Sequence, residues 1–179
     1  MGKVYDSITP AIQAFIEAQQ MFFVGTAPLS ENGNVNISPK GLDSFRVLDE
    51  QTVVYADLIG SGIETVAHLK ENGRIVIMFC AFEGKPNIVR LHGQGEVIES
   101  GHTDFESMKE LFPTYTGLRS FIRVVCERVS DSCGFSVPLY EYQGQRSLLN
   151  DWADKKGAES LKVYVEKNNT ESIDGLPGM

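Results

Sequence analysis

The chain has 179 residues, of which 42% are hydrophobic and 22% are charged, and this is typical of one globular domain spanning residues 1–179. Its formal net charge of −8 would repel a nucleic acid backbone, so the composition excludes nucleic acid as a partner. No stretch reaches the roughly 18 apolar residues of a membrane-spanning helix. The three cysteines have neither disulfide nor metal-ligand spacing, which indicates a reduced, cytoplasmic protein without a metal site.

A helix is predicted near the N-terminus. Thr9 followed by Pro10 is a favourable helix start, because a threonine side chain caps free amides and proline is tolerated in the first turn. We expect this helix to continue to about residue 20.

Short runs of β-branched and aromatic residues predict strands through much of the remaining chain. The Asn32-Gly33 pair favours a tight hairpin turn between the first two strands. Parallel crossovers need a dozen or more residues, so short connections favour a mainly β fold, an antiparallel β-barrel with peripheral helices. The strands are predicted at residues 21–27, 35–38, 52–57, 74–82, 87–93, 95–99 and 121–129.

Capping boxes predict two helices between the strands. Ser61 and Glu64 form the first box, and Gly73 ends the helix that follows it. Thr103 and Glu106 form the second box. The helices after the first one are predicted at residues 65–71, 107–112, 147–156 and 159–167, the last two on either side of Gly157.

The first candidate binding residues lie at the end of a predicted strand. Asn36, Ser38 and Lys40 occupy alternate positions and therefore share one face, which can grip a polar ligand. Pro39 stiffens the strand exit, and the Lys40 ammonium suits a phosphate or an electron-rich ring. The residue types alone fit an ordinary exposed hairpin with a surface lysine as well.

A glycine-rich turn at residues 60–62 leads from a strand into the first capped helix. Free amides at a helix N-terminus attract anions, and glycines let an anion approach the backbone closely. Ser61 and Thr65 can add hydroxyl donors, so the turn is a candidate phosphate site. The alternative is that Ser61 only caps the helix.

Arg90 and His92 are two residues apart on a predicted strand and so face the same side. Arg90 can present several donors to a phosphate, and a solvated sheet face explains the pair equally well. Arg119, Arg123 and Arg128 are interpreted as solvated. No serine or cysteine has the surroundings of a nucleophile, so no catalytic residue is assigned.

The order of these segments resembles the pyridoxamine 5'-phosphate oxidase-like, FMN-binding split-barrel family. The similar segments are FVGTA at residues 23–27, VNISPKG at 35–41, YAD at 55–57 and RLHG at 90–93. SCGFSVP at residues 132–138 resembles an uncharacterised branch of that family. The resemblance implies a single split barrel of the FMN-binding type, with its core at about residues 10–138 and a helical extension at about residues 139–179.

The resemblance also implies a homodimer with two FMN sites in the subunit interface. The implied cofactor contacts are Asn36, Ser38, Pro39, Lys40, Ala56, Asp57, Ser61, Gly62, Thr65 and Arg90. Two features depart from the family. Residues 62–65 lack the basic pair that holds the phosphate in family oxidases, and the region around Trp152 lacks a counterpart of their substrate-binding C-terminus, so their substrate is not assigned.

The sequence therefore predicts an FMN-dependent oxidoreductase of unknown substrate, reduced by NADH or NADPH. Lys40 is the residue expected to tune the flavin ring, since the protein's role towards a cofactor is to position it and to set its electrostatics. Two alternatives stay open. One is a non-catalytic module that stores flavin or senses its redox state, and the other is a haem or deazaflavin binder.

Overall fold

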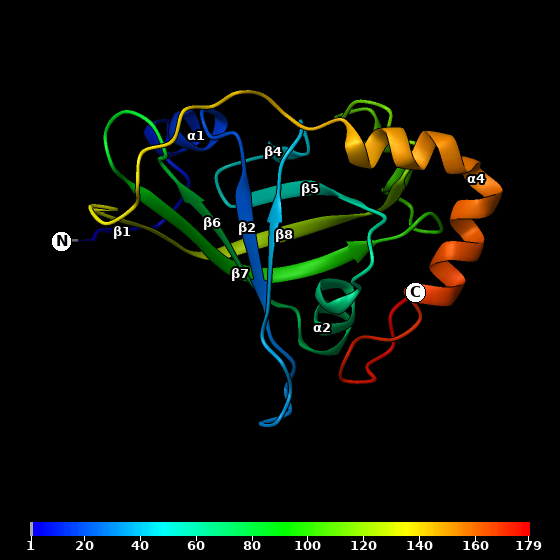
Figure 1. The fold of residues 1–179 in the computed structure, drawn as a ribbon. Coiled ribbons are helices and arrows are strands. Elements are labelled where there is room, and N and C mark those ends of the chain that lie inside the picture. The colour runs from blue at the N-terminus through cyan, green and yellow to red at the C-terminus, as the bar shows by residue number, and fades with distance from the viewer. Residues whose placement is uncertain (1) are drawn as a thin grey trace.

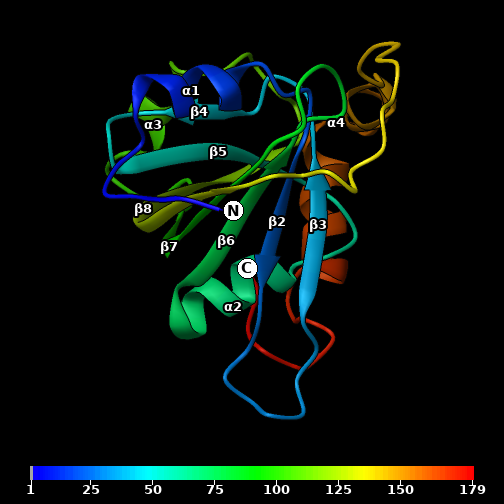
Figure 2. The same cartoon turned by 90° about the vertical axis from the view of Figure 1, so that its left-hand side faces the viewer.

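The computed structural model describes residues 2–179, and an eight-stranded antiparallel sheet lies at its centre (Figure 1). The main path of the sheet has the order β3-β2-β6-β7-β8-β5-β4, and β1 pairs with β8 beside this path. The strands are β1 (Val4–Tyr5), β2 (Phe22–Thr26), β3 (Asn36–Lys40), β4 (Phe45–Val47), β5 (Thr52–Leu58), β6 (Arg74–Cys80), β7 (Ile88–Ile98) and β8 (Leu118–Ser132). Figure 2 shows β3 at the edge of the sheet, next to β2.

The sheet curls so that its two ends approach each other around one core. Phe45 of β4 lies at one end of the strand order, yet its ring packs edge-on against Phe22 of β2 near the other end, with 5.0 Å between the ring centroids. Phe45 also packs against Phe79 of β6 at 5.0 Å, and Tyr55 of β5 packs against Phe22 at 5.5 Å. These contacts confirm the expected mainly β fold of the split-barrel type.

Residue alternation along the strands explains why this core forms. In β2, Phe22, Val24 and Thr26 are buried and the residues between them are partly exposed, as expected for a strand with one face inward. Residues 53–57 of β5 are all buried, because α3 (Phe105–Lys109) packs on the outer face of that strand. Each large apolar side chain buried in this way contributes about 1.5–3 kcal/mol.

Helices cover the ends and one side of the barrel. Besides α3 they are α1 (Pro10–Glu17), α2 (Glu64–Asn72) and α4 (Leu148–Asn168). Figure 1 shows α1 and α2 at opposite ends of the barrel and α4 beside it. No helix within residues 2–179 is long and apolar enough to cross a membrane.

Several predicted helix boundaries are confirmed. Thr9 caps α1, since its Oγ1 accepts a hydrogen bond from the Ile12 amide at 3.3 Å. Gly73 ends α2 with a left-handed φ of 71°, a conformation that glycine adopts without steric cost. Gly157, with φ 71° and ψ 162°, interrupts α4 and separates it into the two expected helical parts.

The predicted tight hairpin turn at Asn32-Gly33 is wrong. Residues 27–35 connect β2 to β3, and Gly33 does not adopt the positive φ that such a turn requires. A contact distant in sequence holds this connection instead, because the Asn34 amide donates to Asp174 Oδ2 at 2.8 Å. Tertiary contacts therefore override the local turn signal.

The predicted helix caps and one strand boundary also need correction. Ser61 does not cap α2, since Ile63 occupies the N-cap and no side chain bonds to the first turn. Asp104 precedes α3, again without a side-chain cap. The two strands predicted at residues 87–93 and 95–99 are one strand, β7, whose pairing with β8 shifts in register between His92 and Gly93.

Candidate functional site

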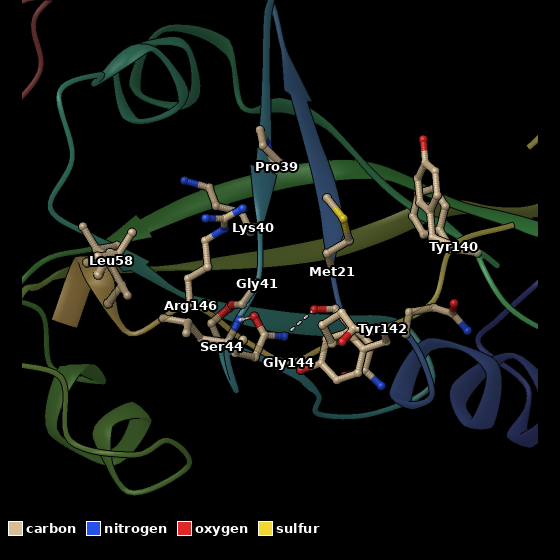
Figure 3. Close-up of a pocket in the computed structure, with 18 of the residues that line it drawn as sticks. Met21, Pro39, Lys40, Gly41, Ser44, Leu58, Tyr140, Tyr142, Gly144 and Arg146 are labelled. Atoms are coloured by element: carbon tan, nitrogen blue, oxygen red, sulfur yellow. Dashed lines mark hydrogen bonds between the residues drawn. The ribbon is translucent and has the colours of Figure 1, made fainter. Parts of the chain in front are cut away.

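A cavity of about 1000 Å³, here called the large cavity, opens beside the end of β3 (Figure 3). Pro39 and Lys40 of β3, Ala56 and Leu58 of β5, and an extended segment before α4 contribute to its walls. This extended segment, residues 139–147, is called the cover segment below. The large cavity therefore combines backbone from the barrel with a wall from the C-terminal part of the chain.

A buried carboxylate lies directly behind Lys40. Asp57 is fully buried, its Oδ1 accepts a hydrogen bond from Lys40 Nζ at 3.3 Å, and its Oδ2 accepts one from Arg119 Nε at 2.8 Å. Burial by itself raises the pKa of Asp57, but the positive charges of Lys40 and Arg119 outweigh burial and hold this pKa below its usual value. The ionised Asp57 therefore fixes the Lys40 ammonium at the cavity wall.

Arg119 also holds the connection between β5 and α2. Its Nη1 donates to the Gly62 carbonyl oxygen and to Asn169 Oδ1, both at 2.9 Å. Asn169 follows α4, is fully buried, and donates from Nδ2 to the Gly60 carbonyl oxygen at 3.1 Å. Asn169 of the C-terminal region therefore helps to fix the glycine turn, because Asn169 and its partner Arg119 bond to the carbonyl oxygens of Gly60 and Gly62.

The interpretation of the β8 arginines as solvated is only partly correct. Arg128 is exposed, and Arg123 forms surface ion pairs with two carboxylates. Arg119 is buried, with its side chain 4% exposed. The prediction is wrong for Arg119 because the charge of Asp57, on the neighbouring strand, compensates its desolvation.

A few contacts hold the cover segment over the large cavity. The Tyr140 amide donates to the Phe82 carbonyl oxygen at 2.9 Å, and the two rings stack with 5.2 Å between their centroids. The Tyr142 amide donates to Glu83 Oε1 at 2.9 Å. Gln145 adds two side-chain hydrogen bonds to the rim. Both tyrosines remain largely exposed, so the segment covers the cavity without being buried itself.

A second cavity of about 420 Å³, here called the small cavity, lies at the N-terminus of α2. Asn36, Ser61, Gly62 and Glu64 are among its lining residues. The Glu64 carboxylate is so close to Gly62 that a Cβ added there would meet Oε2 at 2.5 Å. Within residues 2–179, no lysine, arginine or histidine lines this cavity. The carboxylate therefore opposes an anion at the helix N-terminus.

The side chains of β3 that share a face meet α2 and β5. Asn36 Nδ2 donates to Thr65 Oγ1 at 3.0 Å and approaches Thr26 Oγ1 at 3.3 Å. Ser38, the next residue on this face, has a buried Oγ with no hydrogen-bond partner among residues 2–179. Buried hydroxyls are normally paired, so Ser38 Oγ is an unsatisfied buried polar atom between Asn36 and Lys40 on this face.

Arg90 lies away from both cavities. It belongs to β7, and its Nη1 donates to Ser132 Oγ of β8 at 3.0 Å. His92, two residues further along the strand, is exposed. One chain alone therefore does not bring Arg90 to Lys40 or to Ser61.

The predicted contact residues thus fall into three groups. Pro39, Lys40 and Ala56 line the large cavity, Asn36, Ser61 and Gly62 line the small cavity, and Ser38, Asp57, Thr65 and Arg90 line neither. Arg119, Asn169 and the cover segment were not predicted. A single arginine or asparagine in the sequence carries no signal of a distant partner, and two tyrosines in a polar stretch were the only signal of the cover segment.

Comparison of the sequence with known proteins connects the chain to one protein family. The sequence model of the family described as pyridoxamine 5'-phosphate oxidase matches residues 8–133. The chain is 36% identical over 196 aligned positions to the pyridoxamine 5'-phosphate oxidase family protein ustO of Aspergillus flavus, which covers 98% of this chain and 77% of that protein.

Two solved structures share the fold. A HupZ variant from Group A Streptococcus has a TM-score of 0.57 and 24% identity, covering 70% of this chain and 99% of that one. A FAD-binding protein from Mesorhizobium loti has a TM-score of 0.50 and 10% identity, covering 73% of this chain and 96% of that one. At 24% and 10% identity, the likeness to these two structures shows a shared fold alone.

Proposed function

Because the chain belongs to the pyridoxamine 5'-phosphate oxidase family, we propose that it binds a flavin, specifically FMN, in the large cavity and acts as an oxidoreductase. The observation that carries this proposal is the Lys40 ammonium, which lines the cavity and is held by the buried Asp57. A bound flavin supplies hydride transfer to or from a substrate. The name of the FAD-binding protein from Mesorhizobium loti supports a flavin as the ligand class.

The large cavity fits a flavin ring in size and in chemistry. Ligand cavities commonly measure roughly 300–1,000 Å³ and combine apolar walls with a few polar groups. Leu58 and Ile59 provide apolar wall, Lys40 provides a cation, and Tyr140 and Tyr142 provide aromatic faces.

The small cavity does not fit the phosphate of FMN. Glu64 supplies a carboxylate there, and no basic side chain of residues 2–179 lines this space. A phosphate would meet repulsion from Glu64 that the helix N-terminus alone offsets only weakly, by about 0.3–1 kcal/mol. Contacts from Ser61, Gly62 and Thr65 to the cofactor therefore stay predictions.

The protein's own part in the reaction is electrostatic and steric. Two cations, Lys40 and Arg119, surround the single carboxylate of Asp57, so the cluster keeps a net positive charge. This charge at the cavity wall stabilises negative charge that develops on an electron-rich ring. The cover segment restricts the access of water from one side, which strengthens electrostatic interactions inside the cavity.

The absorption spectrum of the protein purified without added ligand tests the proposal. We expect the visible bands of an oxidised flavin, their bleaching by NADH or NADPH in the absence of oxygen, and FMN as the compound released on unfolding. A haem spectrum, or a colourless protein that binds neither added FMN nor FAD, would contradict the proposal. A deazaflavin among the released compounds would show that the cofactor is a deazaflavin and not FMN.

A non-catalytic flavin-binding role is the second candidate. Within residues 2–179, no histidine, cysteine or aspartate lines the large cavity, and Glu83, one of its two glutamates, already accepts the Tyr142 amide, so few imidazoles or carboxylates are free there to move protons. This composition favours a module that stores flavin or senses its redox state. Rapid turnover of an artificial electron acceptor by the NADH-reduced protein would exclude this role.

We also propose that the protein is a homodimer. β3 ends the strand order of the sheet, so one of its edges has no partner strand within residues 2–179. Its Ile37 is 70% exposed, and Val35 just before it is 71% exposed. Exposed apolar edges favour association. Light scattering during size-exclusion chromatography should give twice the mass of one chain, and a monomer at micromolar concentration would contradict the proposal.

A further inference from the structure

We propose that Lys40 and Arg146 form an anion-binding subsite at one end of the large cavity, which takes a carboxylate or phosphate group of the molecule bound there. Both side chains line the cavity, and Figure 3 shows the Arg146 guanidinium extending from the cover segment toward the end of β3 that carries Lys40. The inference deepens the proposed function, on which it rests for the position of the flavin near Lys40.

The charges around this end of the cavity are not balanced by the chain itself. Asp57 is the carboxylate that pairs with Lys40, and Arg119 shares it. None of the ion pairs within residues 2–179 includes Arg146. Arg146 is exposed, so its guanidinium is free to bind an anion that enters this end of the cavity.

Two carboxylates also line the large cavity, and one of them is held away from Arg146 by its hydrogen bond to Tyr142. They are Glu83 and Glu141. Glu83 accepts the Tyr142 amide hydrogen bond at 2.9 Å, and Figure 3 shows Tyr142 on the opposite side of the cavity from Arg146. The cationic end is therefore separated from the carboxylate that accepts the cover-segment amide.

Gln145 anchors the cover segment beside Arg146. Its Oε1 accepts a hydrogen bond from the Leu42 amide at 3.0 Å, and its Nε2 donates to the Gln20 carbonyl oxygen at 2.7 Å. The fit at the rim is close, since a Cβ added at Gly41 would meet Gln145 Oε1 at 2.9 Å. Both functional groups of the Gln145 amide are thus used to anchor the cover segment next to Arg146.

A guanidinium and an ammonium together suit an oxyanion. Arginine binds a carboxylate or a phosphate through two parallel hydrogen bonds, and lysine adds a point charge. The small cavity offers the opposite environment, with Glu64 and no basic side chain from residues 2–179. The anionic group belongs either to the substrate or to the phosphate of the cofactor.

Thermal unfolding in the presence of simple oxyanions tests the subsite without flavin. Inorganic phosphate and benzoate serve as probes for wild type, Arg146→Ala, Arg146→Lys and Arg128→Ala. Arg128 is an exposed arginine outside both cavities and is the matched control. We expect both probes to raise the unfolding midpoint of wild type and Arg128→Ala. Arg146→Ala should lose this shift and Arg146→Lys should keep part of it.

FMN and riboflavin distinguish the two sources of the anion, because they differ only by the phosphate. If the cofactor phosphate occupies the subsite, Arg146→Ala should weaken FMN binding by about tenfold, or about 1.4 kcal/mol, and should leave the affinity for riboflavin unchanged. If a substrate anion occupies it, both flavins should keep their affinities, and phosphate or benzoate should still bind flavin-loaded wild type but not flavin-loaded Arg146→Ala.

The subsite is refuted if Arg146→Ala keeps the wild-type response to both probes and the wild-type ratio of FMN to riboflavin affinity. Failure of the proposed function has a different signature. In that case no variant binds a flavin, whereas the oxyanion shifts of the flavin-free protein still depend on Arg146.

Discussion

The large and small cavities both adjoin the glycine turn before α2, but within residues 2–179 only the large cavity has basic side chains in its lining. Gly60 lines the large cavity, whose charged residues include Lys40 and Arg146, and Gly62 lines the small cavity beside Glu64. Hydroxyl groups and free helix amides are present at the small cavity, yet the carboxylate there disfavours an anion. The comparison teaches that the charge around such a turn decides what it can bind.

The same buried cluster stabilises both sides of this turn. Arg119 bonds to Asp57 behind the large cavity and to the Gly62 carbonyl oxygen beside the small one. Asn169 bonds to the Gly60 carbonyl oxygen between them. The turn is therefore fixed from the barrel side, and the cavities differ through the side chains that face them.

Removing the buried carboxylate should have the largest effect. Asp57→Asn keeps the shape of the side chain but leaves Lys40 and Arg119 without a counter-charge, so the free energy of unfolding should fall by about 3–5 kcal/mol. Urea unfolding measures this loss. As a control, Asp43→Asn breaks an exposed pair with Arg46 and should cost about 0–1 kcal/mol. Equal, small losses in both variants would show that the cluster does not stabilise the turn.

Acid should remove part of the same stabilisation. The pKa of Asp57 is lowered in the folded state, so its contribution is fully present above the ordinary aspartate pKa of about 3.9 and is lost as the pH falls through the lower folded-state value. We therefore expect wild type to lose more stability than Asp57→Asn between neutral pH and that acidic range. Parallel losses in urea titrations at both pH values would be inconsistent with an ionised Asp57.

A pair of substitutions compares the cavities as flavin sites. Lys40→Met removes the cation of the large cavity while keeping the length of the side chain, and it should weaken FMN binding by about tenfold. Ser61→Ala removes a hydroxyl that lines the small cavity and should change FMN affinity by less than about twofold, or 0.4 kcal/mol. Quenching of flavin fluorescence measures both. If Ser61→Ala weakened FMN binding more than Lys40→Met, the flavin would be assigned to the small cavity.

The smallest effect is expected from Glu64→Gln. If no phosphate lies at the N-terminus of α2, removing this carboxylate should leave the ratio of FMN to riboflavin affinity within about twofold of wild type. A phosphate at that helix end would gain about 0.3–1 kcal/mol or more from the loss of the negative charge. A selective gain in FMN affinity would therefore assign the phosphate to the small cavity.

The regular part of the fold is accessible from the sequence because it depends on local patterns. Thr9 marks a helix start through its side-chain cap, and Gly73 and Gly157 mark helix boundaries through their backbone preferences. The strands β2 and β5 carry apolar residues that fill the barrel. The hairpin turn at Asn32-Gly33 failed as a signal because a contact to Asp174 holds that connection.

The candidate site is less accessible, since its geometry depends on residues far apart in sequence. Lys40 was predicted from its strand position, but its carboxylate partner is shared with Arg119 from β8. Ser61 was predicted as a helix cap and as a phosphate contact; it does not cap α2, and it lines the small cavity. Arg146 carries no motif, and only the packing of the cover segment brings it to the cavity.

A crystal structure of the protein with bound FMN tests most directly whether the large cavity is the flavin site. We expect the isoalloxazine ring in the large cavity, in contact with Pro39, Lys40 and Ala56 and covered by residues 139–147. A ring placed in the small cavity beside Ser61 and Glu64, with the large cavity free of flavin, would contradict this assignment.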